Sequence, residues 1–258
     1  MKLNYIIPRI FLDFLRLIRA IFIYLSHRKI LLKNKEIKGT KLGKTVFVIA
    51  NGPSLNDFDH NKLKNKDVIV MNNFDLCAWK DEPNIVAHCI GEPKDSDHWG
   101  VDQIEISNNT NALSYWYHYS VNDQIKKYTN INHSSPFYFI APVIPENLFI
   151  SRKFNLSSVT LGYNTTAQMA IMIAVYMGYS QINLIGFDHD MLKNRYVSPH
   201  FYEEGNGAVI VDKTNESYLS LMNRCVKMWN RYYKIKEVAD ANNVRITNKT
   251  KNSFLDVF

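Results

Sequence analysis

Residues 45–55 read TVFVIANGPSL, an apolar run of strand length that ends in a turn with glycine and proline. Its positions are apolar in succession, which is typical of a strand covered on both faces. Similar apolar runs follow at residues 67–72, 84–91, 136–143, 181–187 and 244–247. These runs predict a sheet whose strands are buried on both sides.

Two helical segments alternate with these runs. Residues 165–179 (TTAQMAIMIAVYMGY) contain no proline, with Thr165 or Asn164 suited to cap the start and Gly178 the end. Residues 217–242 carry apolar or aromatic side chains at helical spacing. The alternation predicts an α/β fold, with a Rossmann-like, mostly parallel sheet and helices on both faces.

Residues 95–132 are polar and aromatic and fit neither pattern, so we expect a small insertion or lid there. With 258 residues, 46% of them hydrophobic and 21% charged, the chain is long enough for one large core. Its three cysteines have no CxxC spacing, which predicts buried reduced thiols and no zinc site.

The first 32 residues predict an amphipathic helix at a membrane surface. Arg9, Asp13, Arg16 and Arg19 recur at steps of three or four, which places them along one stripe of a helix. Four charges argue against a span, because each costs about 2.5–3.5 kcal/mol at mid-bilayer. We expect residues 1–32 to lie on an anionic membrane surface. The alternative is packing on the chain's own core or on a second subunit, so a homo-oligomer stays open.

Residues 33–44 are rich in lysine and predict a basic linker, which would add attraction to anionic lipid. Residues 45–258 would then form the catalytic domain. The net charge of +7 suits a phosphate-bearing substrate, nucleic acid or an anionic membrane. Nucleic acid is the weakest of the three, because the basic residues gather in the linker and no nucleic-acid-binding motif is present.

The turn at Asn51, Gly52, Pro53 and Ser54 is the strongest candidate for a binding site. Ligands of open α/β sheets bind beyond the carboxyl ends of the strands. A turn with glycine exposes N–H groups and lets a phosphate come close, while Asn51 and Ser54 add side-chain donors. The segment matches neither the Walker pattern nor GxGxxG. The alternative is a tight turn in which Ser54 caps a helix.

Asn72 and Asn73 follow the second apolar run. A carboxamide there could contact a nucleobase, ribose or sugar through its donor and acceptor atoms. The alternative is an asparagine that satisfies its own turn.

A third group of polar residues begins after the run at 181–187: Gly186, Asp188, His189, Asp190, Arg195, Tyr196 and His200. A histidine suits proton transfer from a sugar hydroxyl near neutral pH. A tyrosine or arginine can bind a departing phosphate. Residues 188–190 are consecutive and cannot all face one point at a strand end, so we expect no metal site.

Together these motifs resemble the bacterial sialyltransferases of glycosyltransferase family 42 and the related domain of motility-associated flagellin glycosylation proteins. The family's opening motif appears here as residues 50–55, and its second-strand motif as residues 72–74. Its helix opening resembles Thr165, Thr166 and Ala167, and its Gly-x-Asp matches residues 186–188. The resemblance covers roughly residues 45–247.

The resemblance implies direct, inverting transfer of a sialic acid or related 2-keto sugar from a CMP-sugar to a glycan or lipid-linked acceptor, with no cofactor. His200 would be the base, and Tyr196, helped by Arg195, would stabilise the leaving phosphate. Asn51, Asn72 and the backbone of residues 52–54 would hold the nucleotide. Asp190 stands where the family has another phosphate-binding tyrosine.

Two other functions compete with this interpretation. A metal-dependent nucleotide transferase or pyrophosphokinase-like enzyme on the same fold would use Asp188 and Asp190 as metal ligands. A non-enzymatic, membrane-associated binding module would depend on the basic N-terminus. For the glycosyltransferase we expect a peripheral location on the cytoplasmic face of the bacterial inner membrane, in lipopolysaccharide or capsule biosynthesis.

Overall fold

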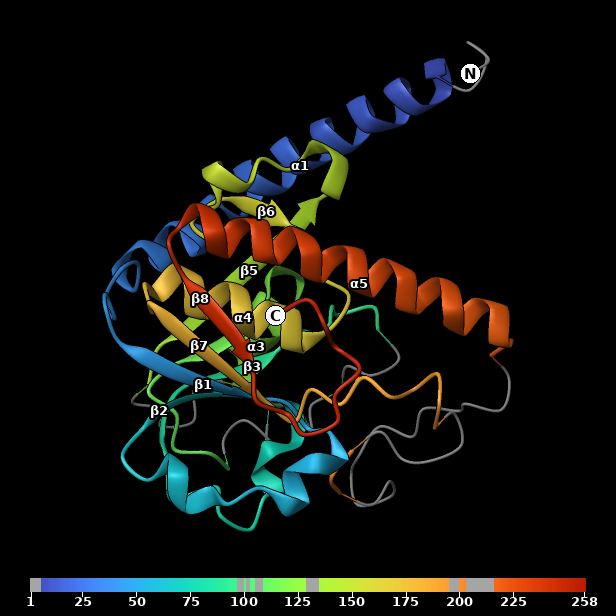
Figure 1. Cartoon of the computed structure of the whole chain (residues 1–258). Coiled ribbons are helices and arrows are strands. Elements are labelled where there is room, and N and C mark those ends of the chain that lie inside the picture. The colour runs from blue at the N-terminus through green and yellow to red at the C-terminus, as the bar shows by residue number, and fades with distance from the viewer. Residues whose placement is uncertain are drawn as a thin grey trace.

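The computed structural model describes residues 6–96, 100, 103–104, 109–128, 135–194, 200–202 and 216–258, with the backbone alone for 6–10. Within these ranges the chain forms an eight-stranded sheet in the order β6-β5-β4-β3-β2-β1-β7-β8, and all neighbouring strands are parallel (Figure 1). The strands are β1 (Thr45–Ile49), β2 (Asp67–Met71), β3 (Asn84–Ile90), β4 (Tyr115–His118), β5 (Phe137–Ile144), β6 (Val159–Leu161), β7 (Gln181–Ile185) and β8 (Arg245–Asn248). The expected Rossmann-like α/β fold is confirmed.

Helices cover the two faces of the sheet differently. On one face α4 (Thr166–Met177) packs against β1, β2 and β3, and α5 (Tyr218–Ala241) lies over α4 (Figure 1). The other face carries the short α3 (Asn122–Tyr128) and a series of 3-10 turns, including η3 (Pro53–Asp57), η4 (His60–Leu63), η5 (Asn72–Leu76) and η6 (Tyr119–Val121). Further 3-10 turns are η2 (Asn34–Glu36), η7 (Glu146–Leu148) and η8 (Ser151–Lys153).

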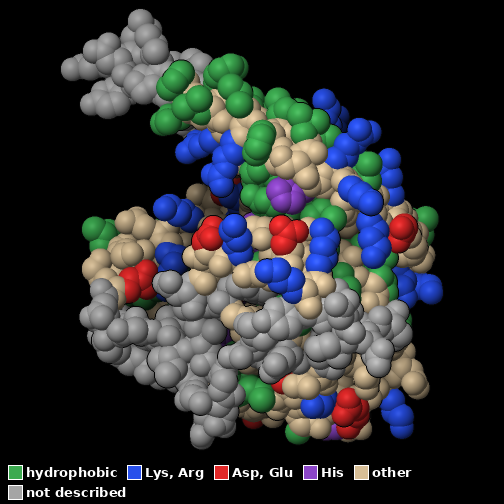
Figure 2. Space-filling model, turned by 180° about the vertical axis from the view of Figure 1, so that it is seen from behind, with side chains coloured by type: hydrophobic (Ala, Val, Ile, Leu, Met, Phe, Trp, Pro, Cys, Tyr) green, Lys and Arg blue, Asp and Glu red, His purple; other side chains and the backbone are tan. Residues whose placement is uncertain are grey.

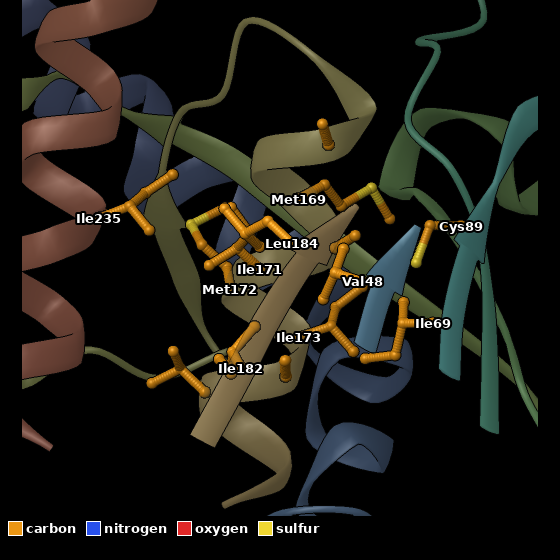
Figure 3. Close-up of a cluster of buried hydrophobic side chains, with 14 of the residues drawn as sticks. Val48, Ile69, Cys89, Met169, Ile171, Met172, Ile173, Ile182, Leu184 and Ile235 are labelled. Atoms are coloured by element: carbon orange, nitrogen blue, oxygen red, sulfur yellow. The ribbon is translucent and has the colours of Figure 1, made fainter. Parts of the chain in front are cut away.

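Helix α4 is the centre of the larger core, and all of its residues are buried. Figure 3 shows its Met and Ile side chains between the sheet and α5, in contact with Val48, Ile69, Leu184 and Ile235. The Thr165 side chain accepts a hydrogen bond from the Gln168 N–H, and Gly178 ends the helix with φ of 92°. Both caps predicted from the sequence are confirmed.

The stretch expected as an insertion or lid needs correction where the structure describes it. Tyr115–His118 form β4, which lies between β3 and β5 in the sheet, and α3 follows soon after. Trp116 is buried on the face of the sheet that α4 covers, and Tyr115 and Tyr117 are buried on the opposite face. Large aromatic side chains suit such a position, so residues 115–128 belong to the main fold.

The carboxyl half of helix α1 (Ile6–Lys33) packs against β5 and β6, and its amino half projects away from the body (Figure 1). Ile23 and Leu31 are buried against Ala141. No helix in the described part of the chain is long and apolar enough to cross a membrane.

Residues 33–44, expected as a linker, begin at the end of α1 and run along the body of the protein. The Asn34 side chain is fully buried and donates hydrogen bonds of 2.7 Å to the carbonyls of Phe139 and Leu156. The N–H groups of Gly39 and Lys41 donate to carbonyls at the end of α4. These contacts attach the end of α1 to the core.

The strand order has a switch point between β1 and β7. From β1 the chain continues to β2 on one side, whereas β7 and β8 add on the other side. In open parallel sheets a ligand crevice forms where the direction of winding changes, beyond the carboxyl ends of the strands. The turn at residues 50–55 and the loop at residues 186–190 both begin at this point.

Candidate functional site

The turn after β1 is in direct contact with the loop after β7. The Gly52 N–H donates a 3.0 Å hydrogen bond to the Gly186 carbonyl. A Cβ atom on Gly52 would lie 1.9 Å from Oδ2 of Asp188 and 2.5 Å from the Gly186 carbonyl oxygen. Gly186 has φ of +73°, a conformation that favours glycine. Both glycines are therefore required by this contact.

Asp188 fastens the two segments together. Its Oδ1 accepts a 3.1 Å hydrogen bond from the Ser54 N–H, and its Oδ2 accepts one of 2.7 Å from the Ser54 hydroxyl. Desolvation raises the pKa of Asp188, while the bonds from Ser54 act in the opposite direction. The start of η3 carries no side-chain cap, so the bond to Asp188 explains Ser54 better than capping does.

A pocket of about 170 Å³ opens beside this contact, and we call it the switch pocket. Its lining brings together residues from six segments of the chain: Ala50, Asn51, Gly52, Met71, Asn72, Thr165, Thr166, Ala167, Gly186, Asp188, His189, Asp190, Met191, His200 and Met228. Most of the candidate residues named from the sequence therefore share one cavity. Pro53 and Ser54 do not line this pocket, and Asn73 is buried outside it.

Two carboxamide oxygens of the switch pocket have no hydrogen-bond partner in the described part of the structure. They are Oδ1 of Asn51 and Oδ1 of Asn72, and both atoms are buried. Asn51 Nδ2 donates to the Met71 carbonyl over 3.3 Å. A buried acceptor without a donor costs free energy, and the two residues that carry these oxygens both line the switch pocket.

His88 holds Asn72 in an unusual backbone conformation. Asn72 has φ of +47°, and its carbonyl accepts a 2.8 Å hydrogen bond from His88 Nε2. Burial lowers the pKa of His88 to about 4, so the ring is neutral at pH 7. Its Nδ1 then accepts a hydrogen bond from the Thr110 hydroxyl over 2.7 Å.

His189 also lines the switch pocket, as a member of the third polar group named from the sequence. Its Nε2 lies 2.9 Å from the Tyr232 hydroxyl oxygen on α5, and its φ is +54°. Burial lowers the pKa of His189 to about 4, so it too is neutral at pH 7. The contact with Tyr232 links the loop after β7 to α5.

His200 reaches the switch pocket from a short segment that lies on the turn after β1. The Phe201 N–H donates a 2.8 Å hydrogen bond to the Asn51 carbonyl, and Asn56 Nδ2 donates to the Phe201 carbonyl over 3.1 Å. His200 thereby faces the same cavity as Asn51 and Thr166. Arg195 and Tyr196 lie outside the described residues.

Neither a metal-binding cluster nor an exposed thiol is found among the described residues. No group of three or more His, Cys, Asp or Glu residues there is arranged to hold a metal ion. Cys77, Cys89 and Cys225 are buried and unpaired, as expected. Burial raises the pKa of Cys77 to about 11, which keeps this thiol protonated at pH 7.

Comparison with known proteins supports the fold. No family model matches the chain, and no curated protein matches it. Among solved structures, the MAf glycosyltransferase from Magnetospirillum magneticum AMB-1 is similar with a TM-score of 0.51 at 13% sequence identity. The match covers 89% of this chain and 37% of that one. The chain thus has a fold found in a much longer glycosyltransferase, and this likeness does not extend to membership of family 42.

Proposed function

We propose that this chain is a glycosyltransferase that binds a nucleotide-sugar donor in the switch pocket. The observation that carries the proposal is the pair of buried, unpartnered oxygens on Asn51 and Asn72 at the switch point of the sheet. Ribose hydroxyls and the exocyclic amine of cytosine are donors of the required kind. The fold shared with a glycosyltransferase supports the same reaction class.

The donor in this proposal is a CMP-linked sialic acid or related 2-keto sugar, as the resemblance to family 42 implies. His200 takes the proton of an acceptor hydroxyl, and that oxygen forms a bond to the anomeric carbon. The bond from this carbon to the phosphate oxygen breaks, and its electron pair leaves with CMP. The anomeric configuration inverts in this single displacement.

Charge stabilisation at the leaving phosphate completes the proposed mechanism. Tyr196 and Arg195 would donate hydrogen bonds to the phosphate as its charge grows. The backbone of residues 52–54 offers no free N–H group to the phosphate, because Pro53 has none and the Gly52 and Ser54 N–H groups are already engaged with Gly186 and Asp188. Their role in this proposal is to fix the shape of the pocket, while Thr165 and Thr166 at the start of α4 supply hydroxyl groups to the donor.

Peripheral membrane binding belongs to the proposal as well. Phe14, Ile18 and Phe22 expose about half or more of their surface on the projecting part of α1. Figure 2 shows hydrophobic side chains gathered along this part of the helix, with Lys and Arg side chains beside them. A helix of this kind binds an anionic lipid surface, which would bring the enzyme to a lipid-linked or cell-surface glycan acceptor at the cytoplasmic face of the inner membrane.

Calorimetric titration with CMP, CDP, UDP and GDP tests the donor assignment. We expect selective binding of CMP, and about 3–10-fold weaker binding in Asn51→Ala or Asn72→Ala, since each loses one hydrogen bond to the nucleotide. The exposed Asn61 provides the control Asn61→Ala, which should bind CMP like the wild type. Equal, negligible binding of all four nucleotides would refute the proposal. Activity lost in EDTA would instead favour the metal-dependent alternative.

A further inference from the structure

A second cavity, of about 400 Å³, lies on the other side of Asp188 from the switch pocket. We call it the lysine pocket, after the three lysines in its lining: Pro53, Ser54, Asp57, Phe58, Ile185, Asp188, Asp190, Lys193, Asn194, Lys249, Thr250, Lys251, Asn252 and Phe254. Asp188 and Asp190 line both cavities. The two pockets therefore share one wall, and a ligand in each would meet at these carboxylates.

The loop that carries two of the lysines is firmly attached to the end of β7. The Phe187 N–H donates a 3.0 Å hydrogen bond to the Thr250 hydroxyl, and the Phe187 carbonyl accepts one of 2.5 Å from the Ser253 hydroxyl. The Phe254 N–H donates to the Asp188 carbonyl over 2.9 Å. The backbone at Lys249 and Lys251 is thus held in place relative to the switch pocket.

The three lysine ammonium groups of the lysine pocket are available to a ligand. Both carboxylate oxygens of Asp188 accept hydrogen bonds from Ser54, and Asp190 accepts one of 2.5 Å from Asn194 Nδ2. Among the described residues, Lys193, Lys249 and Lys251 form no ion pair with a carboxylate. The same lining also carries three carboxylates, of Asp57, Asp188 and Asp190, so the three ammonium groups supply local charged donors for an anion rather than a net positive field.

The rim of the same pocket suits a sugar ring. The Phe254 side chain is half exposed, and Lys193 Nζ lies 6.0 Å from its ring centroid. The apolar C–H face of a sugar packs well on an aromatic ring, while its hydroxyls need polar partners. Asn194, Thr250 and Asn252 supply such groups.

We infer that the lysine pocket is the acceptor subsite and that the acceptor is an acidic glycan, whose carboxylate or phosphate is bound by Lys249 and Lys251. This inference rests on the proposed transferase function, which places the donor in the switch pocket. An acceptor hydroxyl directed past Asp188 and Asp190 then enters the cavity that His200 lines. The acid group fixes which hydroxyl points that way.

The test is an NMR titration of the full chain with glucose, glucuronate, glucose 6-phosphate and inorganic phosphate. We expect one or both acidic sugars to bind at least about tenfold more tightly than glucose. The double variant Lys249→Gln/Lys251→Gln should lose that preference, and Lys249→Arg/Lys251→Arg should keep most of it. The better of glucuronate and glucose 6-phosphate identifies the acid group. Lys126→Gln, on the exposed surface of α3, is the control.

Three results would overturn the inference: equal affinity for glucose and both acidic sugars, an acid preference that survives in the Gln double variant, or phosphate binding as tight as that of glucose 6-phosphate. CMP binding by the same variants should match the wild type, because neither lysine lines the switch pocket. Acid-sugar binding without any CMP binding would refute the proposed transferase while leaving the anion specificity of the lysine pocket in place.

Discussion

At the scale of single residues, the contact of Gly52 and Ser54 with Gly186 and Asp188 joins the two sides of the switch point. It joins β1 to a loop more than 130 positions later in the chain through one backbone and two side-chain hydrogen bonds. There is no room for a side chain on Gly52 because the carboxylate and a carbonyl oxygen already fill that space.

Gly52→Ala should therefore destabilise the protein and impair the switch pocket together. Overpacking of this kind costs about 1–3 kcal/mol, which corresponds to a melting temperature lower by roughly 2–12 °C for a domain of this size. Thermal unfolding followed by circular dichroism measures the first effect, and CMP titration the second. Gly100→Ala is the matched control, since a Cβ there meets nothing within 4 Å. An unchanged melting temperature in Gly52→Ala would contradict this account.

The sequence predicted those site residues that directly follow a strand or open a helix, because their place in the chain is enough to put them at one edge of a parallel sheet. Asn51, Asn72 and Asp188 are of this kind, and all three line the switch pocket. The contact of His189 with Tyr232, 43 positions away, has no local pattern that would reveal it. The lysine pocket depends on a loop after β8 for the same reason.

At the scale of elements, α1 is divided into a packed half and a projecting half. The inward stripe includes Asp13, which accepts hydrogen bonds from Arg16 and from Asn147 near β5. One part of the predicted charged stripe thus faces the body of the protein, and the outward surface is largely apolar.

The double variant Phe14→Asp/Phe22→Asp should reduce binding to vesicles of phosphatidylglycerol and phosphatidylcholine by at least about tenfold. Each phenylalanine that leaves water contributes about 1.5–3 kcal/mol to binding, and a new carboxylate is repelled by anionic lipid. Vesicle co-sedimentation measures the effect. Leu219→Asp, a similarly exposed apolar site in the first turn of α5, serves as control. Equal sedimentation of the double variant and the wild type would argue against the membrane role of α1.

Asn34→Ala tests how firmly α1 is attached to the core. The substitution leaves two buried carbonyls, of Phe139 and Leu156, without their donor, which costs about 1–3 kcal/mol. Urea unfolding should show this loss, whereas Lys35→Ala on the exposed side of the same turn should unfold like the wild type. If both variants were as stable as the wild type, residues 33–44 would behave as the flexible linker that their composition predicts.

Most elements of the sheet were predictable because a buried parallel strand is a continuous apolar run. β4 was not, since its sequence YWYH combines aromatic and polar residues within a polar stretch. β6 has only three residues and gives too short a signal for any periodicity. The caps of α4 were predictable because they rest on local chemistry alone.

At the scale of the whole molecule, one buried and two partly buried histidines make stability depend on pH. Burial lowers the pKa of His88, His118 and His189 to about 4, against about 6.5 in the unfolded chain. Between these values only the unfolded state binds the proton. The unfolding free energy is thus highest, as far as these histidines are concerned, above pH 6.5. It decreases as pH falls towards 4, by about 1.4 kcal/mol per pH unit for each histidine.

Urea unfolding between pH 7 and pH 5 should accordingly show a steep loss of unfolding free energy. His88→Gln removes one of the three groups, so its slope should be shallower by about 1.4 kcal/mol per pH unit than that of the wild type between about pH 6 and pH 5, where the unfolded state alone binds this proton. His60→Gln, on the surface beside Glu82, is the control. Identical slopes for His88→Gln and the wild type would show that His88 is not held neutral by burial.

The position of β1 between β2 and β7 also bears on how the protein is made. During synthesis β1 can pair with β2 almost at once, but its other edge waits until Gln181–Ile185 has left the ribosome. Until then the nascent chain presents an open, apolar strand edge of the kind that promotes misassembly. A chain that stops near residue 180 should therefore aggregate rather than fold, and chaperone contact should be strongest before β7 emerges.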